Sequence, residues 1–588
     1  MKINDILGKF LVWRIRNVST RNFVILLSVL IGCISGLAAV ILKTTVYIIQ
    51  EFLTGGRYHE YFFLIYPLAG IVLTIIISRY FLREKMGHGI TDIIFSISRK
   101  SSQVEGSKTY SRMVTSSVTV GFGGSVGLEA PIVVTGSAIG SNVAQFLHLD
   151  YANRTVLVAC GAAASISAIF NSPIAGVLFC FEVLMTDMPI IGFIPLLIAS
   201  VSGSLVSLAL LGDDILFAFH LNESLRTTDI PYYIILAIIT GMVSLYFTRM
   251  NYWIERKIRR FRNFLVRGIV GGILLGLIIY FFPSIYGEGY DTIKAVLNGQ
   301  EFRMMNTMGF IMPENSLFPI LFLTGIILIK PIATSLTISA GGSGGIFAPS
   351  LFLGGITGLL FSTAVNAITG GALLNPAIFT LIGMCGVMSG VLHAPLTAIF
   401  LIAEITSGYM LIVPLMIASA ISFYTIIYFE RFSIYTKKLY ESGDYDPYDR
   451  DKQVLTILNL NKLIETDLLP VKPDHKLREL IGQIRKSSRN IFPVVNENQE
   501  LAGIITLDDI REIMFDEEAW DKTIVRNLMH TPPDIVDAHD DMKKVMKKFE
   551  STGAWNLPVI QDGKYIGFVS KSSIFSAYRV NLRRKFFG

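Results

Sequence analysis

Charged residues are scarce in this sequence. Of its 588 residues only 16% are Asp, Glu, Lys or Arg, whereas 52% are hydrophobic. This composition excludes an ordinary soluble chain and is typical of an integral membrane protein. Apolar runs near or beyond the roughly 20 residues that span a bilayer recur between Phe23 and Tyr428. The sequence therefore predicts a multi-pass helical protein embedded in a lipid bilayer.

Cysteine is also rare, and the few cysteines lie in apolar stretches without paired spacing. We interpret Cys33, Cys160, Cys180 and Cys385 as small core residues rather than as a disulfide framework. The sequence lacks an H-E-x-x-H motif, so it offers no zinc-protease signature. We expect no required cofactor, no metal site and no enzymatic activity.

The N-terminal segment, residues 1–21, has little acidic charge: Asp5 stands against Lys2, Lys9, Arg14, Arg16 and Arg21. Such a basic excess beside an apolar span favours a cytoplasmic N-terminus. We expect both termini in the cytoplasm and the chain in a plasma or inner membrane. Cytoplasmic loops and the basic C-terminal tail account for the net charge of +6, so no nucleic-acid partner is needed.

The composition becomes polar after Glu441, which divides the chain into a membrane part and a soluble α/β part. The second part contains two copies of a pattern in which two short apolar strands precede a helix. The predicted boundaries are 22–440 for the membrane part, 441–464 for a linker and 465–588 for the soluble part, with modules at about 465–516 and 527–580.

Gly121–Pro131 carries one acidic residue, Glu129, and Met113–Leu149 contains no other Asp, Glu, Lys or Arg. An isolated carboxylate in an apolar segment is costly and marks a candidate site for ions or protons. The glycines and Pro131 predict a broken helix, which is tolerated at membrane depth where it lines a cavity. The alternative is a glutamate at an aqueous end of its segment.

The membrane part contains an internal repeat. Asn171–Val183 reappears as His393–Ile405, and Gly127–Pro131 is echoed by Gly345–Pro349. Such a duplication indicates a transporter-type fold with its site where interrupted helices of the two halves meet.

The glycine-rich run Ser339–Pro349 lies in a stretch, Pro331–Ala403, that has no charged residue. A helix that starts near Pro349 would direct free N–H groups and its positive dipole end into the membrane. That arrangement favours an anion site made of backbone, whereas a cation pathway would need carboxylates or carbonyl rings.

These motifs resemble those of the CLC family of chloride channels and proton-coupled exchangers, followed by a tandem CBS domain. Gly127–Pro131 is similar to the family's G-(K/R)-E-G-P motif, and Gly345–Pro349 fits G-x-F-x-P. The resemblance implies an α-helical polytopic fold of two repeated halves with broken helices, a homodimer, and one chloride pathway per subunit that is gated by Glu129. The anion-binding groups that it implies are His88, Gly89, Ile90, Leu128, Glu129, Ala130, Ile346, Phe347, Ala348 and the hydroxyl of Tyr435.

Three residues depart from the family pattern. His88 stands where the family has a serine, Leu128 replaces the usual basic residue, and Thr91 replaces a proline. A histidine is able to donate an N–H to an anion and to add charge when protonated. The alternative is that His88 points away and only backbone amides contribute.

The resemblance also bears on mechanism. Exchangers of the family usually carry an inner glutamate for protons, and that position falls on Val183 here, whereas Glu182 and its repeat mate Glu404 are interpreted as structural. We therefore expect a passive, voltage-gated type of chloride channel. The alternative is a proton-coupled chloride antiporter of the same family.

For the soluble part, the resemblance implies an adenine nucleotide between the two CBS modules. The ribose-recognition pattern is present at Thr506 and Asp509, but the matching run Ser570–Ser573 has no Asp. The alternative is a structural dimerisation domain without a nucleotide.

Two other functions deserve comparison. Gly341–Gly344 matches the G-x-S-G of intramembrane serine proteases, with Ser343 as nucleophile and His393 as base. The glycine run already has a backbone role, which disfavours this interpretation. A CBS-regulated divalent-cation transporter is disfavoured because the membrane part lacks acidic clusters.

Overall fold

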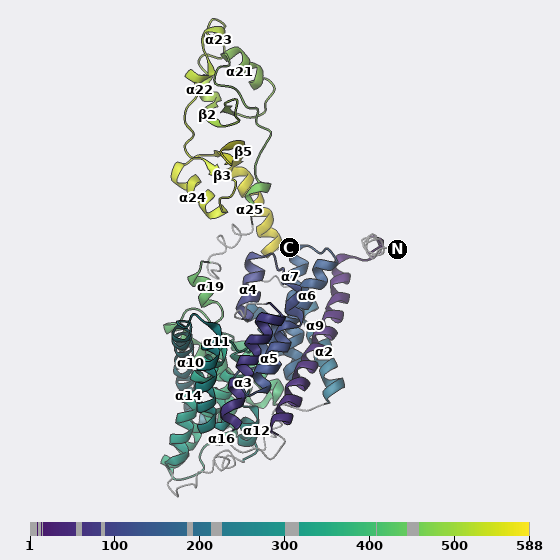
Figure 1. Cartoon of the computed structure of the whole chain (residues 1–588), viewed down its shortest axis with the longest axis vertical. Helices are drawn as coiled ribbons and strands as arrows, with labels where there is room; N and C mark the ends of the chain where they lie inside the picture. The colour runs from purple at the N-terminus through teal and green to yellow at the C-terminus, as the bar shows by residue number, and fades with distance from the viewer. Residues whose placement is uncertain are drawn as a thin grey trace. The chain divides into compact units, whose positions relative to one another are not determined.

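The computed structural model describes residues 9, 13–14, 16–54, 62–83, 89–184, 192–212, 226–299, 317–406, 409–443 and 458–586. The chain divides into two compact units, Met1–Tyr445 and Asp446–Gly588. The first unit is helical and the second mixes helices with short strands (Figure 1). The predicted fold class is therefore confirmed, while the exact domain limits stay predictions.

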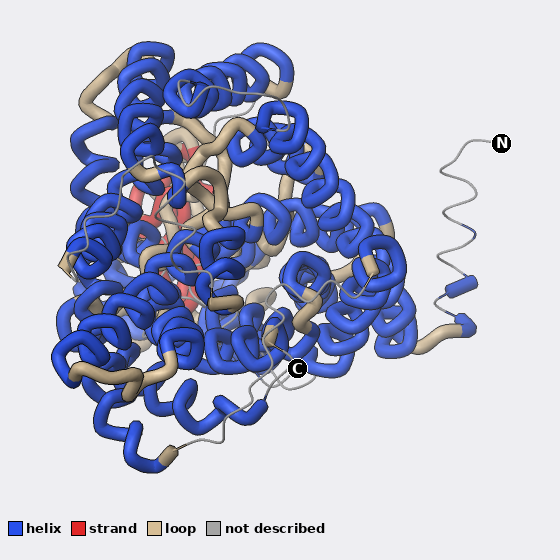
Figure 2. The backbone as a smooth tube through the Cα atoms, turned by 90° about the horizontal axis from the view of Figure 1, so that it is seen from below, coloured by secondary structure: helices blue, strands red, loops and turns tan. Residues whose placement is uncertain are grey.

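The first unit is built from helices, which Figure 2 shows close to end-on in blue. Nine helices within the described residues are long and apolar enough to cross a membrane. The helices are α2 (Thr20–Thr54), α3 (Phe62–Ile76), α4 (Ile90–Arg99), α5 (Ser111–Gly121), α6 (Glu129–Phe146), α7 (Tyr151–Phe170), α8 (Pro173–Phe179), α9 (Phe193–Leu211), α10 (Ile230–Ile258), α11 (Phe264–Phe281), α12 (Tyr290–Leu297), α14 (Phe318–Ala340), α15 (Phe347–Thr369), α16 (Pro376–Leu392), α17 (Pro395–Ile405), α18 (Ile412–Phe429) and α19 (Lys437–Glu441).

Apolar side chains cover the outside of these helices. Leu26 on α2 is 62% exposed, Leu205 on α9 is 58% exposed and Leu321 on α14 is 70% exposed. In a soluble protein such a surface would drive association, whereas a hydrocarbon environment accommodates it. The outer surface of this unit is suited to lipid.

The sequence repeat corresponds to a structural repeat. Asn171 and His393, the first residues of the two repeated segments, are left-handed helix ends with φ of 54° and 56°. Each is followed by a helix that begins with proline, α8 at Pro173 and α17 at Pro395, where the missing N–H costs nothing. The two halves therefore place equivalent residues in equivalent conformations.

Close helix contacts are repeated as well. A Cβ atom at Gly136 of α6 would lie 2.2 Å from the carbonyl oxygen of Gly161 on α7, and one at Gly354 of α15 would lie 2.3 Å from that of Gly383 on α16. Glycine at these positions allows the helix backbones to touch, which is a common way to pack helices in membranes.

The second unit contains the predicted pair of modules. Its elements are α21 (Leu477–Ile484), β1 (Ile491–Val495), β2 (Leu501–Thr506), α22 (Leu507–Ile510), α23 (Ala519–Lys522), β3 (Val536–Asp537), α24 (Met542–Thr552), β4 (Asn556–Gln561), β5 (Lys564–Ser570) and α25 (Lys571–Phe586). Strands β1 and β2 form one antiparallel pair, and β4 pairs antiparallel with β5 and parallel with β3. The register pairs Ile491 with Thr506 in the first module and Asn556 with Ser570 in the second, so the hairpins correspond.

The start of this unit lies inside the segment that we expected to be a linker. Leu458 and Leu460 are buried in the second module's core, against residues that include Val536 and Phe549. The hydrophobic side chains of residues 458–464 therefore contribute to that core.

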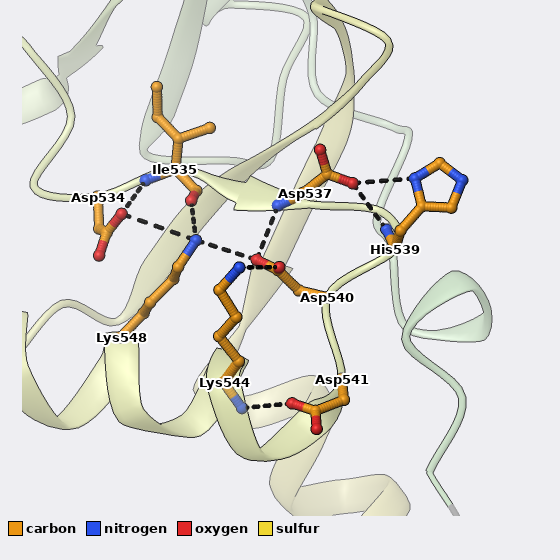
Figure 3. A network of polar contacts seen from close by, with 8 residues as sticks. All are labelled: Asp534, Ile535, Asp537, His539, Asp540, Asp541, Lys544 and Lys548. Carbon is orange, nitrogen blue, oxygen red and sulfur yellow. Dashed lines mark hydrogen bonds and ion pairs between the residues drawn. The ribbon is translucent and has the colours of Figure 1, made fainter. Parts of the chain in front are cut away.

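A network of charges ties β3 to α24 (Figure 3). Asp540, whose side chain is 6% exposed, accepts from Lys544 at 2.6 Å and from Lys548 at 3.0 Å, and its Oδ2 accepts from the amide of Asp537 at 3.1 Å. Burial acts to raise the pKa of Asp540, but these three donors outweigh it and the pKa is lowered. The ionised carboxylate thus stabilises the fold of this module.

Candidate functional site

The two glycine-rich loops meet at the centre of the membrane unit. The amide of Gly127 donates to the carbonyl of Gly345 at 2.9 Å, and the amide of Gly345 donates back to Gly127 at 2.8 Å. Helix α6 begins two residues later at Glu129, and α15 begins at Phe347. The predicted broken helices are confirmed, and the amino ends of two helices from the two repeats lie side by side.

A third helix end and Tyr435 complete this arrangement. Helix α4 begins at Ile90 after Gly89, which adopts a φ of 60°. The hydroxyl of Thr91 donates to the carbonyl of Tyr435 at 3.0 Å. The Tyr435 hydroxyl is buried and has no hydrogen-bond partner within the described part of the chain. His88, the residue that departs from the family serine, lies outside the described residues.

These groups line a cavity of about 160 Å³. Of the predicted anion-binding residues, Gly89, Ala130, Ile346 and Tyr435 contribute to its wall. The structure therefore brings residues from three helix ends and from the segment before α19 to one space. Free backbone amides at helix amino ends and a hydroxyl favour an anion.

Basic side chains dominate the charge of the cavity wall. Arg112, Arg259, Arg267 and Lys438 line it, against the single carboxylate of Glu255. Glu255 pairs with Lys438 and, at 2.8 Å, with Arg259. An excess of positive charge in a cleft raises the local concentration of anions. The sequence did not predict that these basic residues share one cavity, although it showed that they lie at the ends of apolar segments.

Glu129 is buried, with 1% of its surface exposed. Its Oε1 accepts from the hydroxyl of Tyr290 at 2.8 Å, and its Oε2 has no hydrogen-bond partner among the described residues. A Cβ atom at Gly127 would lie 2.0 Å from that Oε2, so the carboxylate is folded back over the loop junction. The amides of Glu129 and Ala348 face it. The alternative of a glutamate in water is wrong.

Three polar residues beside Glu129 escaped the sequence analysis. Glu288 accepts from the amide of Leu128 at 3.1 Å, and Tyr290 holds Glu129. Lys330 is fully buried and donates to the hydroxyl of Ser125 at 2.9 Å. A signal was present for Lys330, which is the only charged residue within the apolar helix α14. Glu288 gave none, because Asp291 and Lys294 follow it closely in the sequence. The Leu128 amide was predicted to bind an anion, but in the structure it donates its hydrogen bond to the Glu288 carboxylate.

Glu182 and Glu404 lie away from this cavity wall. Glu182 accepts from the amides of Leu396 and Thr397 at 2.9 and 2.7 Å, at the start of α17. Glu404 accepts from the amides of Ile174 and Ala175 at 3.0 and 2.9 Å, at the start of α8. These contacts agree with the structural role that we expected for both residues. Val183, next to Glu182, is 6% exposed in an apolar environment.

The protease hypothesis finds no support in the geometry. Ser343 lines the cavity described above and accepts from the Thr115 hydroxyl at 3.1 Å. His393 ends α16 and packs its ring against Phe423, and no contact between Ser343 and His393 occurs in the described structure. Nor do the described residues contain a group of three or more His, Cys, Asp or Glu that could hold a metal ion.

In the second unit, Thr506 and Asp509 lie together at the start of α22. The amide and hydroxyl of Thr506 donate to Oδ2 of Asp509 at 2.6 and 2.7 Å, and His530 lies 3.2 Å from the same oxygen. Burial acts to raise the pKa of Asp509, but these contacts outweigh it and the pKa is lowered. In the second module, the matching Ser570 hydroxyl donates to Glu465 at 2.6 Å. The two modules thus differ at the equivalent position.

Comparisons with known proteins agree with this architecture. A family model described as voltage gated chloride channel matches residues 69–426, and a CBS domain model matches residues 460–516 and 525–580. The chloride channel protein CLC-f of Arabidopsis thaliana is 24% identical over 95% of this chain and 81% of its own length. The H(+)/Cl(-) exchange transporter ClcA of Salmonella typhi is 27% identical over 67% of this chain and 83% of its own length.

Solved structures share the fold. A slow cyanobacterial Cl-/H+ antiporter superposes with a TM-score of 0.62 at 20% identity, covering 72% of this chain and 99% of the other. A eukaryotic CLC transporter gives a TM-score of 0.56 at 18% identity over 94% of this chain and 99% of its own.

Proposed function

The chain belongs to the voltage gated chloride channel family and carries two CBS domains, and from this premise we propose that it conducts chloride or similar anions passively along a pathway gated by Glu129. The family consists of membrane transporters and channels rather than enzymes. Transport of chloride across a membrane is thus the general function.

One observation supports the proposal that Glu129 is the gate. Its carboxylate lies where the amino ends of α6 and α15 converge. Amides at such an end stabilise either this carboxylate or a free anion. The two negative groups compete for the same donors. Protonation of Glu129, or its rotation away, would therefore let an anion pass.

The passive mechanism rests on Val183. Two points support it: by resemblance, Val183 corresponds to the inner proton-accepting glutamate of the family's exchangers, and its side chain is buried among apolar residues. An alkyl side chain neither binds nor releases a proton. Movement of an anion would then be independent of a proton moving in the opposite direction.

The competing proposal is proton-coupled antiport. Relatives such as ClcA of Salmonella typhi are named as H(+)/Cl(-) exchange transporters, and a structural neighbour is a Cl-/H+ antiporter. Exchange requires a route that delivers protons to Glu129 without Val183. The described neighbours of Glu129 include one hydroxyl, that of Tyr290, through which a proton could be relayed.

A reversal-potential measurement on the purified chain in liposomes separates the two mechanisms. With a fixed chloride gradient, a channel gives the same potential whether or not a proton gradient is imposed. An antiporter gives a potential that shifts with the proton gradient in a fixed ratio. A shift of that kind refutes the channel proposal and leaves the anion pathway intact.

We further propose a homodimer in a plasma or inner membrane, with both termini in the cytoplasm. The family resemblance supports the dimer, and the basic residues before α2 support the orientation. Cross-linking in native membranes and protease protection of an epitope at each terminus test these points.

A further inference from the structure

The Glu288 side chain accepts a hydrogen bond from one of the backbone amides at the amino end of α6. Its Oε1 accepts from the amide of Leu128 at 3.1 Å, immediately before Glu129. The amides of Glu129 and Ala130 follow in the same turn, and no backbone acceptor for either occurs within the described residues. Two carboxylates, Glu288 and Glu129, therefore lie at one helix end.

The position of Glu288 is fixed by several contacts between its loop and the loop before α6. The hydroxyl of Ser125 donates to the carbonyl of Ile285 at 2.8 Å, and the amide of Gly287 donates to Gly123 at 3.3 Å. Lys330 donates to the same Ser125 hydroxyl at 2.9 Å. These bonds hold the Glu288 loop against the end of α6.

The loop that carries Glu288 and Tyr290 lets the two side chains contact different groups at the amino end of α6. Gly287 and Gly289 have φ of 59° and 87°, conformations that suit glycine and allow a tight reversal. Glu288 thereby reaches the Leu128 amide, while Tyr290, at the start of α12, reaches Glu129. The charges that face Glu288 are Glu129 from α6, Lys43 from α2 and Lys330 from α14.

A helix amino end stabilises one negative charge well, but a second one nearby is repelled. Glu129, Glu288 and an entering anion would place three negative charges around α6, against the two lysines. Protonation of Glu288 lowers the repulsion felt by the anion, and two close carboxyl groups bind protons in linked steps.

We propose that Glu288 is a second proton-binding gate residue, which works with Glu129 at the amino end of α6 and weakens anion binding until it is protonated. This inference rests on the proposed anion pathway through Glu129. It assigns a transport role to a residue that does not belong to either repeated glycine motif.

The test measures chloride efflux from liposomes containing the full-length protein between about pH 4 and 8, the range in which carboxyl groups with shifted pKa titrate. We expect Glu129→Gln to retain acid stimulation of efflux, and Glu129→Gln with Glu288→Gln to lose it. Glu288→Gln alone should tighten chloride binding on the order of tenfold by calorimetry at neutral pH, because a repelling charge is removed.

Two variants serve as controls. Asp291→Asn removes an exposed carboxylate on α12, three residues after Glu288 in the chain, and should leave both readouts unchanged. Glu288→Asp keeps the charge and should keep the acid stimulation. Glu288→Gln preserves an oxygen that can accept from the Leu128 amide, and an unaltered thermal midpoint verifies its fold.

The inference is overturned if Glu129→Gln alone is independent of pH, or if Glu288→Gln changes neither the residual pH curve nor chloride binding. It is also overturned if His88→Ser, rather than Glu288→Gln, removes the residual curve. A wild-type chain that neither binds nor transports chloride refutes the proposed function as well. Normal wild-type transport with an unaltered Glu288→Gln variant refutes this inference alone.

Discussion

Glu182 and Glu404 exchange helix caps between the two repeats. Each carboxylate lies near the end of its own repeated segment and accepts two backbone amides at the first turn of the other segment's helix. Since free amides at a helix start attract negative charge, each cap stabilises the partner helix. The exchange links the two halves of the membrane unit through residues that do not line the cavity of Gly89, Ala130 and Tyr435.

Removing one cap should destabilise the protein without changing its chloride flux. We expect Glu182→Ala to lower the free energy of unfolding by about 1–3 kcal/mol, because buried donors lose charged acceptors. Thermal unfolding in detergent measures the effect, and Glu51→Ala, an exposed carboxylate on α2, is the control. Loss of chloride flux in a stably folded Glu182→Gln variant would contradict a purely structural role.

Glu129→Gln should raise chloride flux and leave a residual dependence on external pH. The amide side chain carries no charge, so it no longer competes with an anion for the ends of α6 and α15. Any remaining pH response would come from the second carboxylate, Glu288. Flux assays in liposomes measure the effect, with Glu51→Gln as the matched substitution. Unaltered flux and pH response in a folded Glu129→Gln variant would rule out Glu129 as the gate.

The helix starts of the site were predictable from the sequence because they depend on local residues. Glycine runs followed by Pro131 and Pro349 predict where α6 and α15 begin, and the structure confirms both. The isolated Glu129 marked the site for the same reason. A structural role for Glu182 and Glu404 was also expected from the sequence, but the helix caps that they form became visible only in the folded chain.

The surroundings of Glu129 depend on contacts distant in sequence, which a motif does not contain. Glu288 is 160 residues from Leu128, yet it takes the amide that the family pattern offers to an anion. Lys330 likewise reaches the loop of Ser125 from α14. Only the folded chain brings these charges together, so the sequence alone could not predict which of them are neighbours.

The charge network of the second module should make its stability depend on pH. Since the pKa of Asp540 is lowered in the folded state, the carboxylate contributes its full stabilisation above its unfolded pKa of about 3.9. That contribution is lost as the pH falls through the folded value, so stability should decline below about pH 5. Asp540→Asn should flatten this decline and destabilise the module by roughly 1–3 kcal/mol at neutral pH.

Thermal unfolding of a full-length chain in which Trp555 of the same module is the one tryptophan kept, followed by its fluorescence, measures this dependence. Glu550→Gln, on the same helix as Lys544 and Lys548, is the control because its side chain is exposed. An unchanged pH curve in Asp540→Asn would show that other groups set the acid sensitivity.

The last prediction concerns nucleotide binding in the first CBS module. If Asp509 holds the ribose of an adenine nucleotide, Asp509→Ala should weaken ATP or AMP binding by about 1.5–3 kcal/mol, the value of hydrogen bonds to a charged group. Asp509 also accepts from Thr506, so its loss uncaps α22.

Ser573→Ala removes the equivalent contact with Ser570 in the second module and is therefore the matched control, with little expected effect on binding. Calorimetry on the purified full-length chain makes the comparison. Equal loss in both variants would point to a general disturbance of the fold, and no binding to the wild type would show that the CBS pair is structural.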